Sequence, residues 1–437
     1  MLGRKTTVYL GPAGNDFILN GKLNDLNAEE IYGPICTPVF GTGVVYDCPN
    51  AKFMEQKKFV KFGLTHAALE SHVRLMEREV LDYIGSEPAF DGQRGILDVP
   101  LVTGQITIFT AGRSLQGAEV RKKLTGEFAK LYHDLDMGFQ PINYVIPWAP
   151  LPQNRRRDTA HARMREVYME IIKERRTYGA KEEEPDMLWN LMRCVYKDGQ
   201  PIPDKEIAHL MITLLFGGQH SSASTSAWIV LHLASRPSIT EELYQEQVRN
   251  FGTNEHGVIE FRPIQHTDIA THMPLMQAVL KETLRIHSPI HSIMRKAMND
   301  IPVPGTQYVI PAGRTMLASP GVMHQQPDYY PNPDEWDPHR WAGDHSAAGE
   351  DERNTVGYGL DAVSKGAKST FLPFGAGRHR CIGESFAYVN ICTIMATLIR
   401  NFRFATLDGS ATVPLTDFTS MLPAPRQPAV VRWERRS

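Results

Sequence analysis

The feature that most constrains the fold of this chain is a long, almost uniformly apolar segment near its middle. From Asp204 to Ser235 the apolar residues recur at helical spacing, and the pair Arg236–Pro237 ends the run. At 1.5 Å per residue, a helix of this length extends about 48 Å, which is enough to cross a large domain. Because nearly all of its faces are apolar, we expect it to lie in the core.

The remaining segments predict a mainly α protein with a minor β-sheet region. Apolar and charged residues alternate at helical spacing in three further stretches: 67–85, 155–176 and 240–251. Short apolar runs between Pro and Gly turns predict one or two hairpins at 301–318, and a strand is expected at 428–436. A Gly/Ser/Asp-rich stretch, 342–369, is typical of a surface loop. No repeat or long linker interrupts residues 1–437, so we expect a single domain.

Composition excludes several classes of protein. The balance of 47 Lys+Arg against 49 Asp+Glu argues against a nucleic-acid partner, and 42% hydrophobic residues argue against a disordered chain. The five cysteines are widely spaced without a C-x-x-C pair, so neither a disulfide framework nor a zinc or iron–sulfur cage is predicted. The sequence contains neither a secretory signal nor an apolar run of membrane-spanning length.

The middle of the long helix contains residues that a buried helix does not favour. In the stretch FGGQHSSAS, Gly217 and Gly218 each cost about 1 kcal/mol relative to Ala, and His220, Ser221 and Ser222 are polar. One interpretation is structural, with packing glycines, a core histidine bonded to a carbonyl and serines bonded back one turn. The other is functional, with a flat ligand against the glycines while His220 and Ser221 face a wet pocket.

A second unusual stretch, FLPFGAGRHRCIGESFAY at 371–388, surrounds Cys381 with glycines and cations. A buried structural thiol is the simplest interpretation. A nucleophile is another, since neighbouring cations and a helix start lower a thiol pKa. Neither requires glycines on both sides of the sulfur, whereas a thiolate that faces a planar group does, because glycine permits close approach of the backbone.

The motif F-G-x-G-R-x-R-C-x-G, Phe374–Gly383, resembles the haem-thiolate loop of the cytochrome P-450 monooxygenase superfamily, in which the cysteine is the axial iron ligand. The segment KETLR contains Glu282 and Arg285, which resemble the E-x-x-R pair of that family. Alone, this pair is typical of a surface salt bridge. In PDEWDPHRW, Arg340 matches the arginine that completes a buried triad behind the cysteine loop. We therefore expect these three residues to support the loop.

Two more segments, 31–59 and GGQHSS at 217–222, resemble the sterol 14α-demethylase branch of fungal type, and the similarity runs through essentially the whole chain. The resemblance implies a cytochrome P-450 fold with haem b buried between the long central helix and the helix behind the cysteine loop. It also implies that residues 1–437 are the catalytic domain of an endoplasmic-reticulum membrane protein, without its N-terminal anchor and the first residues of the domain.

The resemblance assigns residues to haem binding. Cys381 would bind the iron, with Phe374 and Gly375 beside it in the loop. The haem propionates would be held by hydroxyl groups and cations: Tyr32, Tyr46, Lys57, Arg295 and His379. Two carboxylates in a closed site need such donors. For Lys57, in EQKK, a solvated surface position remains the alternative.

The resemblance also assigns the chemistry. His220 and Ser221 would be the acid–alcohol pair next to the iron, and Asp136 would connect His220 to solvent; Ser221 stands where many relatives have threonine. Lanosterol or eburicol would be oxidised three times on the 14α-methyl group, with NADPH-derived electrons from a cytochrome P-450 reductase, in ergosterol-type sterol biosynthesis. The wall of the sterol pocket, which azole inhibitors would share, is expected to comprise Tyr32, Phe40, Val45, Tyr46, Phe139, Phe216, Gly217, His291, Ser292 and Met421.

Other readings of the chain remain open from the sequence. A haem-thiolate monooxygenase could act on another lipid or on a xenobiotic, and a haem protein of this type could be a non-catalytic sensor. A cysteine hydrolase would use Cys381 as its nucleophile. The basic run 155–157 is either a docking site for an acidic reductase or a solvated helix start.

Overall fold

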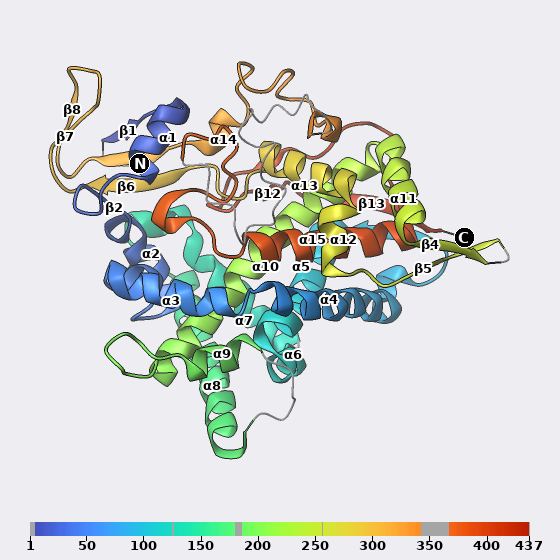
Figure 1. Ribbon diagram of the computed structural model, residues 1–437, viewed down its shortest axis with the longest axis horizontal. Coiled ribbons are helices and arrows are strands. Elements are labelled where there is room, and N and C mark those ends of the chain that lie inside the picture. The colour runs from blue at the N-terminus through green and yellow to red at the C-terminus, as the bar shows by residue number, and fades with distance from the viewer. Residues whose placement is uncertain (1–4, 125, 180–185, 256, 342–366, 437) are drawn as a thin grey trace.

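The long central segment forms one helix that crosses the molecule. The computed structural model describes residues 5–124, 126–179, 186–255, 257–341 and 367–436. Within it, α10 (Asp204–Ala234) begins with the acidic residues Asp204 and Glu206, which favour a helix N-terminus, and ends just before Arg236–Pro237. The other helices are arranged around it (Figure 1). The predicted position and length of this helix are confirmed.

The other helices follow the local signals for helix starts. Thr65 and Asp98 cap α4 and α5 by accepting backbone N–H groups, and proline occupies the first turn of α8, α11 and α13. The helices besides α10 are α1 (Gly11–Leu19), α2 (Glu29–Phe40), α3 (Asn50–Phe62), α4 (His66–Ser86), α5 (Val99–Ala111), α6 (Ala118–Lys123), α7 (Gly126–Asp136), α8 (Pro152–Tyr178), α9 (Met187–Arg193), α11 (Pro237–Phe251), α12 (His266–Thr271), α13 (Pro274–Ile286), α14 (Pro320–Met323) and α15 (Glu384–Asn401).

The strands form small sheets at the edges of the helical body (Figure 1). A four-stranded sheet has the order β1 (Thr6–Val8), β9 (Thr315–Ala318), β6 (Ile293–Ala297) and β2 (Leu26–Asn27). A three-stranded sheet comprises β10 (Phe402–Ala405), β13 (Val430–Arg435) and β3 (Arg94–Asp98). The two-stranded sheets pair β4 (Gly252–Glu255) with β5 (Val258–Phe261), β7 (Ile301–Pro302) with β8 (Val309–Ile310), and β11 (Thr416–Asp417) with β12 (Ala424–Pro425). The predicted hairpin at 301–318 and the predicted C-terminal strand are therefore confirmed.

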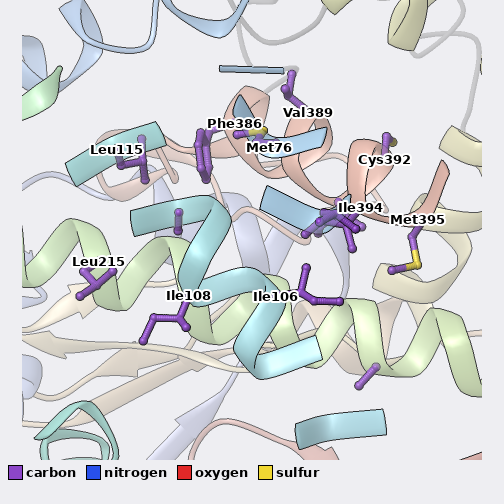
Figure 2. Packing of buried hydrophobic residues seen from close by; sticks show 14 of the residues in the cluster. Met76, Ile106, Ile108, Leu115, Leu215, Phe386, Val389, Cys392, Ile394 and Met395 are labelled. Atoms are coloured by element: carbon purple, nitrogen blue, oxygen red, sulfur yellow. The ribbon is translucent and has the colours of Figure 1, made fainter. Parts of the chain in front are cut away.

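The core lies where α10 meets the helices on its two sides. Figure 2 shows apolar side chains from α5, α10 and α15 meeting in this space, among them Ile106, Leu215, Phe386 and Ile394. Each buried side chain of this size stabilises the fold by roughly 1.5–3 kcal/mol. The helix that follows the cysteine loop, α15, is thereby held firmly against the central helix.

Two sequence predictions concern features other than the core. The predicted surface loop 342–369 lies almost entirely outside the described residues. Among the helices that the structure does describe, none combines the length and apolar character needed to cross a membrane.

Candidate active site

The loop before α15 positions Cys381 by folding back on itself. The N–H of Cys381 donates to the Phe374 carbonyl at 3.0 Å, and the N–H of Gly375 donates to the Leu372 carbonyl at 3.1 Å. Gly375 and Gly377 have φ of +68° and +66°, a region that other residues rarely adopt. A Cβ on Gly377 would lie 2.4 Å from the Leu19 carbonyl oxygen, so no other residue fits there.

Cys381 has exposed surface, although protein surrounds its thiol. Cys381 is exposed by surface area, yet desolvation raises the pKa of its thiol, and the backbone N–H of Gly383 only partly opposes this rise. Both properties hold for a side chain that faces a recess inside the protein. A cysteine hydrolase needs the opposite, a thiol whose pKa is lowered by a neighbouring base. Burial and nearby cations lower the pKa of His379 to about 3, which makes it a poor base.

Glu282, Arg285 and Arg340 form a buried triad. The Glu282 carboxylate accepts hydrogen bonds from Nε and Nη2 of Arg285, at 2.9 and 2.8 Å, and from Nε of Arg340, at 2.9 Å. It also accepts the Trp341 indole N–H at 2.9 Å and the Asp337 N–H at 3.0 Å. The side chains of Glu282 and Arg285 are 0% exposed, so the surface salt bridge that the isolated E-x-x-R pair suggests is wrong.

A histidine connects this triad to the cysteine loop. Arg285 Nη1 donates to the His324 carbonyl at 2.9 Å, and His324 Nε2 accepts the N–H of Leu372, near the start of the loop, at 2.9 Å. Burial lowers the pKa of His324 to about 3, which keeps its Nε2 available as an acceptor. His324 is absent from the sequence predictions, because no motif marks it.

The structure brings together the five residues predicted to hold the haem propionates. The rings of Tyr32 and Tyr46 lie 5.1 Å apart, and Tyr46 stacks on His379 at 5.7 Å. The Tyr32 hydroxyl accepts the N–H of Met294, the neighbour of Arg295, at 2.9 Å. Phe53, which the sequence predictions omit, also stacks on the His379 ring, with the ring centroids 5.4 Å apart.

Several polar atoms in this group are buried without a hydrogen-bond partner. They are Nε of Arg295, both ring nitrogens of His379, and Nε of Arg378, which the sequence predictions omit. A buried guanidinium N–H without an acceptor is costly, so this cluster is suited to an anion with several oxygens. Two carboxylates of a haem fit this requirement.

Lys57 is held by the cysteine loop. Its ammonium group donates to the carbonyl groups of Arg378 and Arg380, at 2.8 Å each. Burial lowers the pKa of Lys57 to about 8, with Cys381 opposing and Arg380 adding to the shift. A solvated surface position for this lysine is therefore wrong.

On α10, the two glycines have different surroundings. A Cβ added to Gly217 would meet no atom within 4 Å, whereas one added to Gly218 would lie 3.1 Å from Leu115 and 3.7 Å from Phe386. Gly218 is thus a packing glycine, and Gly217 borders open space. The Ser221 hydroxyl donates to the Gly217 carbonyl at 3.0 Å, which is the back-bonded arrangement.

His220 and Asp136 face each other across α10 and α7. His220 Nδ1 lies 3.6 Å from Asp136 Oδ1, and the imidazole stacks on the Phe216 ring at 5.9 Å. His220 Nε2 and Asp136 Oδ1 are buried without hydrogen-bond partners. Burial lowers the pKa of His220, and the Asp136 carboxylate opposes that shift. Tyr132, one turn before Asp136 on the same helix, also has a buried hydroxyl without a partner and is absent from the sequence predictions.

Next to this pair, the predicted apolar wall forms an aromatic cluster. The rings of Phe40, Phe139 and Phe216 lie 5.0 to 5.8 Å from one another. Val45 has φ of +51°, which is strained for a β-branched residue and typical of functional sites. Just before β6, His291 Nδ1 lies 2.7 Å from the Ser292 hydroxyl, while Met421 packs against the main core.

A family model for cytochrome P450 matches residues 1–432 of the chain. The chain belongs to the cytochrome P450 family. It is 60% identical over 436 residues to a sterol 14-alpha demethylase of Aspergillus flavus, covering 100% of this chain and 84% of the relative. It is 59% identical over 438 residues to sterol 14-alpha demethylase CYP51A of Gibberella zeae, covering 100% and 85%. The predicted kinship with fungal enzymes of this branch is confirmed.

A solved structure supports the fold of this P450 independently. Retinoic acid bound cyanobacterial CYP120A1 matches with a TM-score of 0.82 at 20% identity, covering 100% of this chain and 90% of that one. The predicted fold is confirmed. Family membership implies a haem bound through a cysteine thiolate, and the cysteine hydrolase reading is wrong.

The basic run at the start of α8 is exposed at Arg155 and Arg156, as expected of a solvated helix start, but not at Arg157. The Arg157 side chain is only 5% exposed and pairs with Asp158 at 2.7 Å, while Arg156 pairs with Asp134 at 3.4 Å. Arg155 is exposed. The run is therefore not a continuous basic surface, because the helical repeat turns Arg157 into the protein.

Proposed function

We propose that this P450 is a sterol 14α-demethylase, a monooxygenase that removes the 14α-methyl group of lanosterol or eburicol in three dioxygen- and NADPH-dependent steps of ergosterol-type sterol biosynthesis. The observation that carries the proposal is the high identity, over the whole chain, to enzymes of that name. The whole chain would act as one catalytic domain, since the family model extends over residues 1–432.

The thiolate of Cys381 is the proposed iron ligand. When bound, the haem supplies the oxygen-activating chemistry, which a thiolate ligand promotes. The loop from Phe374 through Gly375 supports the sulfur through its backbone, and the buried triad fixes that loop through His324. The proposed propionate ligands are Arg295, His379, Tyr32, Tyr46 and Lys57, because Nε of Arg295 and both ring nitrogens of His379 are buried without a hydrogen-bond partner.

His220 is the proposed proton carrier at the reacting side. Its Nε2 is the ring nitrogen without a partner, so it would hold or deliver the proton, while Nδ1 faces Asp136. Asp136 would favour the imidazolium and link it to water. The Ser221 hydroxyl would complete this group by turning away from the Gly217 carbonyl.

The aromatic cluster and Gly217 would form one part of the sterol pocket. A sterol is long and almost entirely apolar, so its binding needs aromatic and aliphatic walls that exclude water from the reacting side. Tyr32, Tyr46 and Val45 would line the same cavity as the cluster, with His291, Ser292 and Met421 at another part of the wall. Azoles would occupy this pocket, and an NADPH-cytochrome P-450 reductase would supply electrons at the endoplasmic-reticulum membrane.

The decisive experiment is spectroscopic. The reduced, carbon monoxide-treated holoenzyme should show the red-shifted band of a thiolate-bound haem. Titration of the ferric form with lanosterol or eburicol should displace the iron-bound water and change the spectrum, and reconstitution with a reductase should release formate. A response to other lipids but to neither sterol would contradict the sterol assignment. Sterol binding without turnover would indicate a sensor.

A further inference from the structure

Outside the candidate active site, two histidines and a glutamate meet between α4 and α12. His66 is the first residue of α4, Glu70 lies one turn later on the same helix, and His266 is the first residue of α12. One ligating atom from each residue lies within 4.8 Å of the ligating atoms of the other two. Among the described residues this is the group of three with metal-ligand character.

The two imidazoles already have the separation that a metal ion requires. His66 Nε2 lies 3.2 Å from His266 Nδ1, and the rings cross at 79°. For Zn–N bonds of about 2.0–2.1 Å, tetrahedral geometry places two ligand nitrogens roughly 3.3–3.4 Å apart. A metal ion can therefore replace the proton shared by the two rings with little movement of either helix.

The protonation state also suits ligation. Burial and the neighbouring His66 lower the pKa of His266, while Glu70 opposes the shift. Neutral imidazole is the form that binds metal, and the carboxylate of Glu70 adds the negative charge that a divalent cation favours. The geometry of the three groups carries this argument, and the lowered pKa supports it.

The surroundings hold the site in place and leave it open on one side. His266 is buried, Glu70 is intermediate and His66 is exposed, so an ion has access from solvent and can keep water as a further ligand. The N–H of Ile264, just before α12, donates to Glu77 Oε2 on α4 at 3.2 Å. This contact keeps α12 beside α4 (Figure 1).

We propose that His66, Glu70 and His266 bind one divalent cation of borderline softness, with Zn²⁺ as the best fit, and that the ion cross-links α4 to α12. Two imidazole nitrogens and one carboxylate suit Zn²⁺, whereas Mg²⁺ and Ca²⁺ prefer sites made only of oxygen. Since α4 and α12 both contact α15, the bound ion stabilises this side of the fold by mass action.

The test uses the haem-loaded protein, purified without a polyhistidine tag and dialysed against a chelator. Calorimetric titration with ZnCl₂ should show one tightly bound ion per chain, and zinc should raise Tm. His66→Ala should weaken this binding more than about 100-fold and abolish the rise in Tm, because even an outer partner of a metal ligand contributes 10–100-fold. Glu70→Gln should weaken the binding as well. MgCl₂ should produce neither effect.

His133→Ala, a change of an exposed histidine on α7, is the matched control and should leave zinc binding unchanged. Both test substitutions lie at or near the surface, and an unaltered carbon monoxide spectrum verifies that each variant keeps its haem. The proposal is overturned if no zinc binds at the expected stoichiometry, or if binding survives unchanged in both His66→Ala and Glu70→Gln.

Discussion

Two buried polar clusters of this P450 are built in opposite ways. Around Glu282, both carboxylate oxygens accept hydrogen bonds, from two arginines, an indole and a backbone N–H. Around His220, the imidazole Nε2, Asp136 Oδ1 and the Tyr132 hydroxyl are buried without partners, and the closest approach of His220 to Asp136 is 3.6 Å.

The difference indicates what each cluster does. A fully satisfied buried network is rigid and strongly specifies one arrangement of the chain. Buried polar groups without partners are costly and need an explanation such as catalysis or a water that connects them. The Glu282 cluster therefore supports the fold behind the cysteine loop, while the His220 cluster leaves polar atoms unpaired, as the proposed proton path requires.

The largest effect is expected when the satisfied cluster loses its charge. Glu282→Gln leaves two buried guanidinium groups without a counterion, which should cost about 3–5 kcal/mol and reduce the yield of haem-loaded protein sharply. Glu166→Gln is the matched control, because Glu166 pairs with Arg163 at the same three-residue spacing, but with side chains 51% and 62% exposed. It should cost less than about 1 kcal/mol. Denaturant unfolding measures the stability of each variant, and the carbon monoxide spectrum measures its yield of haem-loaded protein. Equal losses of stability in Glu282→Gln and Glu166→Gln would contradict the comparison.

The second-largest effect is expected in the His220 cluster, whose polar atoms lack hydrogen-bond partners. His220→Ala should lower turnover by roughly 10²–10⁴-fold, the usual contribution of a positioned acid, while leaving the thiolate-type carbon monoxide band intact. Turnover and the fraction of NADPH coupled to product are measured together. If both remain at the level of the unaltered enzyme, His220 is not in the proton path.

A smaller effect is expected from Asp136→Asn, on the order of 10-fold, as for other residues that orient a reacting group. The Asp136 carboxylate raises the pKa of His220 against the effect of burial. Its removal therefore lowers that pKa, so less imidazolium is present at neutral pH, and the alkaline limb of the pH–rate profile moves to lower pH. Asp134→Asn, on the same helix but paired with Arg156, should leave the profile in place. If the pH–rate profile does not move in Asp136→Asn, the Asp136 carboxylate does not set the pKa of the group that carries the proton.

Local spacing predicted much of the fold and the motif that holds Cys381. The apolar run of α10 and the three-residue spacing of Glu282 and Arg285 are properties of neighbouring residues, and both are readable from the chain. Contacts between distant segments are different. His220 and Asp136 were paired only by resemblance, and neither the bonds of Lys57 to the cysteine loop nor the role of His324 follows from spacing, because tertiary packing determines them.

Tertiary packing also decides which turn of a helix faces which neighbour. The sequence presents Arg155 to Arg157 as one basic run, yet the structure buries Arg157 and leaves Arg155 exposed. The same applies to the adjacent glycines of α10, which the sequence treats as equivalent. Gly218 packs against Leu115, and Gly217 borders open space.

The smallest effect is expected from adding one methyl group at each of these glycines. Gly217→Ala should raise helix stability by about 0.5–1 kcal/mol, since its Cβ meets nothing within 4 Å. The same methyl would enter the proposed sterol pocket and weaken sterol binding by about 1 kcal/mol, which is roughly 5-fold in affinity. The sterol-induced spectral change measures this affinity. Gly218→Ala adds the same group to the same helix but 3.1 Å from Leu115, so crowding should offset the gain in stability and sterol affinity should not change. Thermal unfolding and sterol titration of the pair test this directly: if Gly217→Ala binds sterol as well as Gly218→Ala does, the open space beside Gly217 is not part of the pocket.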